Sequence, residues 1–192
     1  MARKPTPGAR ERILDVAAEL FYDHGVHEVG LQQVIDQCGC GKNLLYREFP
    51  SKDDLVVAWL DRCRADSEAA FDAATESLDD PRAQLLAVVR TIAGDTTNPG
   101  FRGCAIRNTH AEFHDPDHPV HQVSADYFRS LRSRLRRLAK QAGAPDPGGL
   151  ADRLLLVIDG LVTSSAILGP KGPATSAVAL AKDIIDSATQ SL

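Results

Sequence analysis

Apolar residues recur every three or four positions along almost the whole of this sequence. No segment alternates between apolar and polar residues as a half-buried strand does. We therefore predict an all-α fold, with Thr6 capping the first helix and Pro7 opening it. The helices are expected over about 7–24, 31–38, 42–49, 52–78, 81–92, 104–114, 117–140, 149–168 and 174–191.

The composition narrows the class of protein. Of the 192 residues, 43% are apolar and 25% are charged, which is typical of a globular protein. No stretch approaches the roughly 18 apolar residues of a membrane span, and no apolar region of a signal peptide follows the basic start. The net charge of −4 provides no overall attraction to nucleic acid. Any such binding must therefore come from a local patch. Because neither a membrane span nor a signal peptide is expected, we predict a cytoplasmic protein.

Two short predicted helices, 31–38 and 42–49, flank a break at Gly39. This is the organisation of a helix-turn-helix, in which the second short helix enters the major groove of DNA. Short helices around a glycine also occur in plain helical bundles, so the spacing alone leaves both interpretations open.

The residues around this turn narrow the choice. The relevant segments are Phe21-x-x-x-Gly25, Val34-Ile35-x-x-Cys38-Gly39-Cys40 and Leu45-Tyr46-x-x-Phe49-Pro50-Ser51-Lys52-x-x-Leu55. Together they resemble the DNA-binding region of the tetracycline-repressor (TetR) family, and the all-helical remainder resembles that family's ligand-binding and dimerisation region. The resemblance implies a helix-turn-helix domain over 1–50 and a ligand-binding and dimerisation domain over 51–192. It also implies a homodimeric transcriptional regulator, usually a repressor, that a small molecule releases from its DNA operator.

The second short helix would then be the recognition helix. Lys42 and Asn43 open it, and these side-chain types hydrogen-bond guanine and adenine edges respectively. Leu44 is suited to a thymine methyl group. Tyr46 resembles the family tyrosine whose hydroxyl meets a phosphate, and Arg47 is placed for the DNA backbone.

Flanking residues extend this predicted surface. Lys52, at the start of the next helix, would add a phosphate contact. Gln32 stands at a family position that often reaches a base, and Gln33 is a weaker candidate. Leu45 and Phe49 are expected to face the core.

The chain departs from the family pattern in three ways. Gly30 replaces the usual threonine, so the second helix lacks a capping hydroxyl. Glu48 puts an acid where an aromatic residue or histidine is common, which opposes phosphate binding. Residues 1–64 hold nine Lys or Arg and ten Asp or Glu, a net of about −1. Arg3, Lys4 and Arg10 are candidates for a basic arm that compensates.

The cysteines and histidines leave alternatives open. The four cysteines are expected to be reduced, with Cys38 and Cys40 packing as small apolar residues, because no second pair completes a zinc site. A thiol-responsive regulator would use Cys104, whose neighbour Arg107 would lower the thiol pKa. A metal-responsive regulator would use the nearby histidines, which are His110, His114, His118 and His121.

An enzyme or carrier built on a helical bundle is the remaining alternative. The sequence contains no catalytic triad, phosphate loop or HExxH motif. Glu112 with His110 or His114 is the only acid–base pairing it offers. We therefore predict no catalytic residue, no resident metal and no cofactor.

The rest of the chain is expected to supply a pocket and a dimer interface. Candidate pocket residues for an unknown small-molecule effector are Phe101, Cys104, Phe113 and Tyr127. The broad apolar faces of the last two helices indicate burial against a second copy, although both could pack inside one subunit. The predicted interface residues are Leu154, Leu155, Ile158, Leu161, Val162, Ile184 and Ile185.

Overall fold

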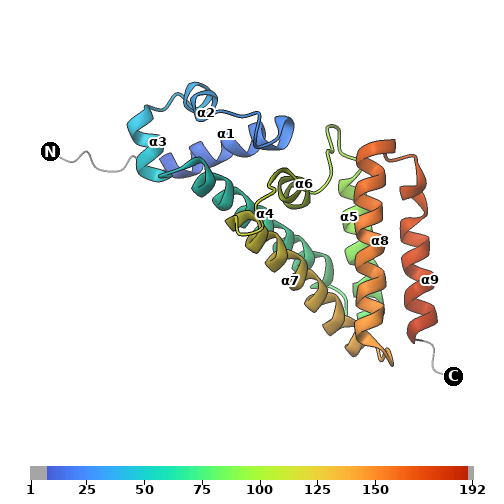
Figure 1. Ribbon diagram of the computed structural model, residues 1–192. Helices are drawn as coiled ribbons and strands as arrows, with labels where there is room; N and C mark the ends of the chain where they lie inside the picture. Colours follow the sequence, from blue (N-terminus) through green and yellow to red (C-terminus); the bar gives the residue numbers. More distant parts are fainter. Residues whose placement is uncertain (1–7, 190–192) are drawn as a thin grey trace. The chain divides into compact units, whose positions relative to one another are not determined.

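The computed structural model describes residues 8–189, in which helices joined by turns and loops are present and no strand occurs (Figure 1). This confirms the all-α prediction. In chain order the helices are α1 (Ala9–His24), α2 (Leu31–Cys38), α3 (Lys42–Glu48), α4 (Lys52–Thr75), α5 (Pro81–Asp95), α6 (Ala105–Glu112), α7 (Pro119–Gln141), α8 (Pro147–Leu168), the 3-10 turn η1 (Pro173–Ser176) and α9 (Ala177–Thr189). The predicted cap Thr6 and first helical residue Pro7 lie outside the described residues.

The chain divides into two compact units. Unit 1 comprises the described residues up to Arg64 together with Ala105–Ser124. Unit 2 comprises Ala65–Cys104 and the described residues from Ala125 onward. The long helices α4 and α7 each contribute one part to each unit.

Unit 1 is built around α1, α2 and α3, which all contact one another. Their amphipathic spacing turns one side of each helix inward, and α4 closes the same core. The rings of Phe21 and Trp59 lie 5.4 Å apart. Arg62 also donates to Asp15 at 2.5 Å, which fastens α4 to α1. The fully buried large side chains of this unit include Ile13, Leu45, Phe49, Leu55, Leu60 and Ile106.

Unit 2 has a second apolar core, to which α5, α8 and α9 contribute as mutually contacting helices (Figure 1). The helices α4 and α7 add Phe71, Leu131 and Leu135. Buried residues from the other helices include Leu85, Val88, Leu150, Leu154, Ile158, Leu161 and Ile185.

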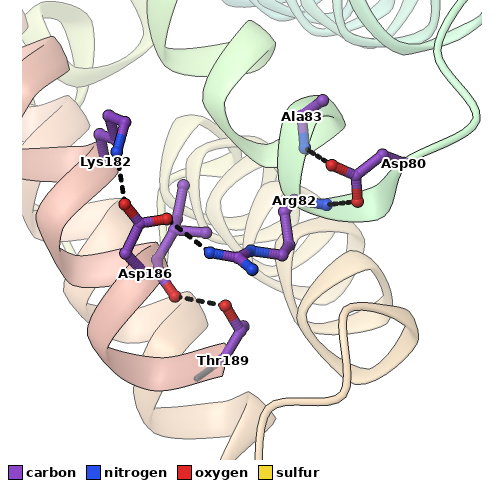
Figure 2. Close-up of polar contacts among 7 residues, drawn as sticks. Asp80, Arg82, Ala83, Lys182, Asp186 and Thr189 are labelled. Atoms are coloured by element: carbon purple, nitrogen blue, oxygen red, sulfur yellow. Dashed lines mark hydrogen bonds and ion pairs between the residues drawn. The ribbon is translucent and has the colours of Figure 1, made fainter. Parts of the chain in front are cut away.

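Polar contacts at the start of α5 link it to α9 (Figure 2). The Asp80 carboxylate accepts hydrogen bonds from the Arg82 and Ala83 backbone N–H groups, at 3.0 and 3.3 Å. The Arg82 side chain then reaches Asp186 at 2.6 Å, and Lys182 donates to the same carboxylate at 2.5 Å. Asp186 therefore joins two helices that are distant in sequence.

The last two helices pack differently from the sequence expectation. Four predicted interface residues, Leu154, Ile158, Leu161 and Ile185, are at most 6% exposed because they form the core of unit 2. Side chains enclosed in this way leave little surface for a second copy, and the role of the predicted residues in a dimer interface stays a prediction. The remaining three, Leu155, Val162 and Ile184, are half-buried.

A different apolar surface is exposed on the same helices. Leu156 is 73% exposed and Leu180 is 50% exposed, and both line a groove of about 320 Å³ between α8, η1 and α9. Ile167 and Leu168 at the end of α8 are 74% and 63% exposed. We call Leu156, Ile167, Leu168 and Leu180 the α8–α9 apolar face. No helix between residues 8 and 189 has the length and apolar character required to cross a bilayer.

Candidate nucleic-acid interface

A glycine turn sets the angle between α2 and α3. Gly39 ends α2 with φ at 61°, a left-handed conformation that glycine adopts without a steric penalty. The Cys40 N–H then bonds the Ile35 carbonyl at 3.2 Å, and Gly41 takes an extended conformation as the cap of α3. The chain thus turns and starts a second helix after three residues.

Burial of one residue determines which face of α3 is exposed. Leu45 is fully buried, and Phe49 directly after the helix is 1% exposed, as the sequence predicted. The opposite side of the helix therefore faces solvent. Lys42, Asn43 and Tyr46 lie on this exposed side, with the Lys42 ammonium 5.8 Å from the centre of the Tyr46 ring. Leu44 is half-buried.

The predicted phosphate ligand Arg47 already has an acidic partner. Its guanidinium group donates to the Glu48 carboxylate through Nε at 3.1 Å and through Nη2 at 2.9 Å. Glu48, the acid that departs from the family pattern, therefore pairs with the cation that would otherwise contact DNA.

Lys52 lies at the first position of α4 and is half-buried. Burial lowers the pKa of its ammonium group from the ordinary value of 10.5, while the nearby carboxylates of Asp53 and Glu112 oppose the shift. Ser51 and Asp54 cap the helix reciprocally, with the Asp54 N–H donating to the Ser51 hydroxyl and the Ser51 N–H donating to the Asp54 carboxylate.

The two glutamines of α2 have different local roles. Gln32 is exposed, and its side-chain amide donates to Asp36 one turn later at 2.7 Å. The Gln33 side-chain oxygen accepts the Gly30 N–H at 2.7 Å, which caps the start of α2. Gln33 therefore compensates for the missing threonine hydroxyl. Its position three residues after the cap was the available sequence signal for this role.

Arg10 adds a further cation close to the end of α3. Its guanidinium lies 4.3 Å from the centre of the Phe49 ring, and the side chain is exposed. The other two members of the predicted basic arm, Arg3 and Lys4, lie outside the described residues.

Unit 1 also holds a contact between α6 and the loop that joins α1 to α2. The Glu112 carboxylate accepts the His27 N–H at 2.9 Å, and the His27 ring lies 2.7 Å from the Glu112 carbonyl. The Phe113 ring stacks on His118 at 4.1 Å and contacts His27 at 4.9 Å. Glu112 and Phe113 thus link α6 to the loop that leads into α2.

The four predicted pocket residues are divided between the units. Phe113 belongs to unit 1, whereas Phe101, Cys104 and Tyr127 belong to unit 2. Tyr127 borders a cavity of about 10 Å³, together with Ser67, Phe71 and others, which has room for no more than a water molecule. Their shared role in effector binding stays a prediction.

The cysteines and histidines differ in part from the sequence expectation. Cys38 and Cys40 are joined in a disulfide, so the prediction that both are reduced and pack as small apolar residues was wrong. The Gly39 turn is responsible, because it brings the two Cα atoms to 5.3 Å. Cys63 and Cys104 are half-buried thiols.

Three of the histidines that the sequence grouped together make side-chain contacts. His110 and His121 lie 3.1 Å apart through their Nδ1 atoms, and His118 lies 3.4 Å from Asp53. His114 is exposed. In the part of the chain that the structure covers, no set of three or more His, Cys, Asp or Glu is arranged to hold a metal ion.

A glycine-turned pair of short helices, with lysine, asparagine, tyrosine and arginine exposed along the second, defines a helix-turn-helix DNA-binding protein. Comparison with known proteins agrees. Residues 13–59 match the family described as bacterial regulatory proteins, tetR family, and residues 81–190 match the C-terminal domain of BetI-type transcriptional repressors. The chain belongs to the TetR family of DNA-binding transcriptional regulators, which are not enzymes.

Individual relatives support the same assignment. The crystal structure of SCO4454, a TetR-family transcriptional regulator from Streptomyces coelicolor, is 30% identical and has a TM-score of 0.91, covering 95% of this chain and 96% of that one. The transcriptional activator FasR of Mycolicibacterium smegmatis is 33% identical over 45% of this chain, and the match spans only 40% of FasR. The transcriptional repressor ComR of Escherichia coli is 27% identical over 68% of this chain and 60% of its own length.

Proposed function

We propose that this protein is a cytoplasmic repressor that binds a DNA operator as a homodimer and leaves it when a small molecule binds. The observation that supports this most directly is the exposed face of α3, which presents Lys42, Asn43 and Tyr46 beside one another while Leu45 holds the helix in the core. Repression rather than activation is supported by the BetI-type repressor match, which extends over residues 81–190.

Two kinds of DNA contact follow from the side chains. Lys42 and Asn43 read base edges in the major groove, because they stand at the exposed first turn of the recognition helix. Tyr46, Arg47 and Lys52 contact phosphates, which fix the position of the helix without reading sequence. The Gln32 amide can reach a base only if it leaves Asp36, and Gln33 acts as a helix cap.

The homodimer forms through the α8–α9 apolar face. These leucine and isoleucine side chains are at least half exposed, and two of them, Leu156 and Leu180, line the groove between α8 and α9. Burial against a second copy removes this apolar surface from water. A two-fold dimer then places two recognition helices in successive major grooves, about 34–36 Å apart.

Release from DNA is a shift between two conformations of the dimer. An effector that binds better when the recognition helices are wrongly spaced lowers operator affinity by its difference in affinity between the two conformations. The helix α4 is suited to transmit this change, because it begins directly after α3 and continues into unit 2.

Selection from a randomised duplex library tests DNA binding without knowledge of the operator. The purified protein is expected to enrich a sequence with two related half-sites about ten base pairs apart. Analytical ultracentrifugation is expected to give a dimer. A monomer that enriches no sequence and retains no duplex at low ionic strength would overturn the proposal.

Variants of the interface separate base reading from phosphate binding. Lys42→Ala and Asn43→Ala are expected to weaken the selected duplex far more than a random duplex, by about 1–3 kcal/mol. Lys52→Ala is expected to weaken both duplexes alike and to reduce the slope of log affinity against log salt by about one. Fluorescence anisotropy over a salt series measures both effects, and equal losses on the two duplexes for Lys42→Ala and Asn43→Ala contradict base reading.

A further inference from the structure

We propose that Cys38 and Cys40 are a reversible thiol–disulfide site that adjusts operator affinity, with the closed disulfide form binding DNA more tightly. The reactant is a low-molecular-weight disulfide. This inference rests on the proposed DNA-binding function and adds a chemical input that acts in the DNA-binding unit itself.

The position of the disulfide is the first observation. Cys38 is the last residue of α2, and Cys40 lies two positions before the first residue of α3. The bond therefore closes the turn that sets the recognition helix. Their Cα separation of 5.3 Å is within the usual range for a disulfide, so the turn accepts the bond with α2 and α3 both formed.

The composition of the turn makes such a bond consequential. Gly39 and Gly41 both lie in this short segment, and glycine loses more conformational freedom on ordering than any other residue. Without the disulfide, the turn is held by weak backbone contacts, among them Gly39 N–H to the Asp36 carbonyl at 3.4 Å and Cys40 N–H to the Ile35 carbonyl at 3.2 Å. Closing the disulfide restricts the conformational freedom of the turn before DNA binds. The turn then has less freedom to lose on binding.

The site is accessible to a small reactant. Both cysteines are half-buried rather than enclosed, and Gly39 and Gly41 are exposed. An added Cβ at either glycine would meet no atom within 4 Å, so open space surrounds the turn. A small thiol or disulfide can therefore approach the sulfur atoms without unfolding the unit.

Stability alone gives little reason for this disulfide. A cross-link stabilises mainly by restricting the unfolded chain, and the effect is smallest for the shortest loops. Here the bonded cysteines are only two positions apart. In the cytoplasm, disulfides are usually transient and serve catalysis or redox sensing. Placement in a DNA-reading turn favours sensing.

The chemistry is a two-electron exchange. The Cys38 thiolate attacks the low-molecular-weight disulfide, forming a mixed disulfide and releasing one small thiolate. The Cys40 thiolate then attacks the Cys38 sulfur, which forms the internal bond and releases the second small thiolate. The two cysteines are oxidised, one small disulfide is reduced to two thiols, and the two cysteine protons pass to the released thiolates.

The test compares the two forms of the full-length protein on one duplex. The protein is equilibrated with defined ratios of reduced to oxidised glutathione, and alkylation with mass spectrometry measures the fraction of Cys38–Cys40 closed. Anisotropy on the library-selected duplex then measures affinity. We expect roughly two- to fivefold tighter binding by the closed form, the size of effect that restricting a glycine has on an ordering equilibrium.

Two variants identify the responsible cysteines. Cys40→Ala is expected to bind with the affinity of the reduced protein and to ignore the glutathione ratio, with circular dichroism confirming its helical content. Cys63→Ala removes a half-buried thiol from α4 and leaves the turn unchanged, so it is expected to respond like the wild type. A response that survives in Cys40→Ala overturns the assignment.

The outcomes separate this inference from the proposed function. If both forms bind the duplex equally, or the reduced form binds more tightly, the redox inference is wrong and DNA binding stands. If the disulfide forms at no glutathione ratio, the inference is also wrong. If neither form retains any duplex, the proposed function itself fails.

Discussion

The ion pair between Arg47 and Glu48 lies at the end of α3, the helix that we propose approaches DNA. Both side chains come from the last turn of α3, and the Glu48 carboxylate accepts from two guanidinium nitrogens of Arg47. The glutamate competes with phosphate for the cation. It thus acts at the level of one residue as a limit on affinity that is independent of sequence.

Glu48→Gln is expected to raise DNA affinity on every duplex. The neutral amide releases Arg47 to bind a phosphate and also removes a negative charge from the interface. We expect roughly threefold tighter binding, and a salt slope steeper by about 0.9 for one added phosphate contact. Anisotropy at several salt concentrations measures both. Glu19→Gln, a neutralised acid at an exposed position of α1, is the control, and an unchanged slope for Glu48→Gln would count against competition.

At the scale of single helices, capping residues determine where each helix begins. Asp80 and Asp146 each cap a helix that opens with proline, and Gln33 caps α2 from inside the helix. These contacts satisfy backbone N–H groups that have no partner within the helix. These interactions are local, because each joins residues only two or three positions apart.

Asp80→Ala is expected to lower the free energy of unfolding by about 0.5–2 kcal/mol. The loss arises because two backbone N–H groups at the start of α5, those of Arg82 and Ala83, lose their acceptor. Urea denaturation measures the change. The neighbouring Asp79 is exposed and precedes the cap, so Asp79→Ala serves as the matched control. Equal losses for both variants would show that charge, rather than capping, is responsible.

The contact between α5 and α9 is expected to weaken in acid. Hydrogen bonds from Lys182 and Arg82 hold the pKa of Asp186 below its ordinary value of 3.8. A carboxyl group whose pKa is lowered by folding stabilises the fold above its ordinary pKa, and this contribution disappears as the pH falls through the lowered value. Asp186→Asn should therefore be less stable than the wild type at pH 7.

Urea midpoints at pH 7 and near pH 2.5 test this dependence. The difference between wild type and Asp186→Asn is expected to shrink at the lower pH, because the wild-type carboxyl becomes neutral as well. Asp183→Asn, an exposed acid on the same helix, controls for the general effect of acid. A difference that stays constant between the two pH values would contradict the contribution of the ionised Asp186.

For the whole molecule, our proposal assigns the assembly of two copies to the α8–α9 apolar face. Leu156 and Leu180 are prominent in it, one from each helix, and both line the groove. A charge placed in the face must be desolvated when the copies meet, whereas it is well hydrated in a monomer. Assembly is therefore more sensitive to such a substitution than folding is.

Leu156→Asp is expected to yield a folded monomer that has lost at least tenfold in operator affinity, because two recognition helices then no longer bind as a unit. Sedimentation velocity measures the assembly state and anisotropy measures the affinity. Ala73→Asp adds the same charge to an exposed position of α4 and should leave both unchanged. A dimeric Leu156→Asp protein would place the interface elsewhere.

What could be predicted from this sequence was local. Helical periodicity, the turn at Gly39 and the inward-facing Leu45 and Phe49 depend on residues within a few positions of each other, and the structure agrees with all of them. The helix-turn-helix resemblance was visible for the same reason, because its motif occupies one continuous stretch of chain.

Contacts between distant segments required the tertiary structure. Only the fold shows that Glu112 meets His27, that Ala105–Ser124 packs with the N-terminal helices, and that Leu154 and Ile158 turn inward while Leu156 faces outward. A broad apolar helix face predicts that the face is buried. It does not predict which partner buries it, because the hydrophobic effect is not directional. Which surface an apolar helix face packs against depends on the packing of the whole chain, so no single segment of the sequence determines it.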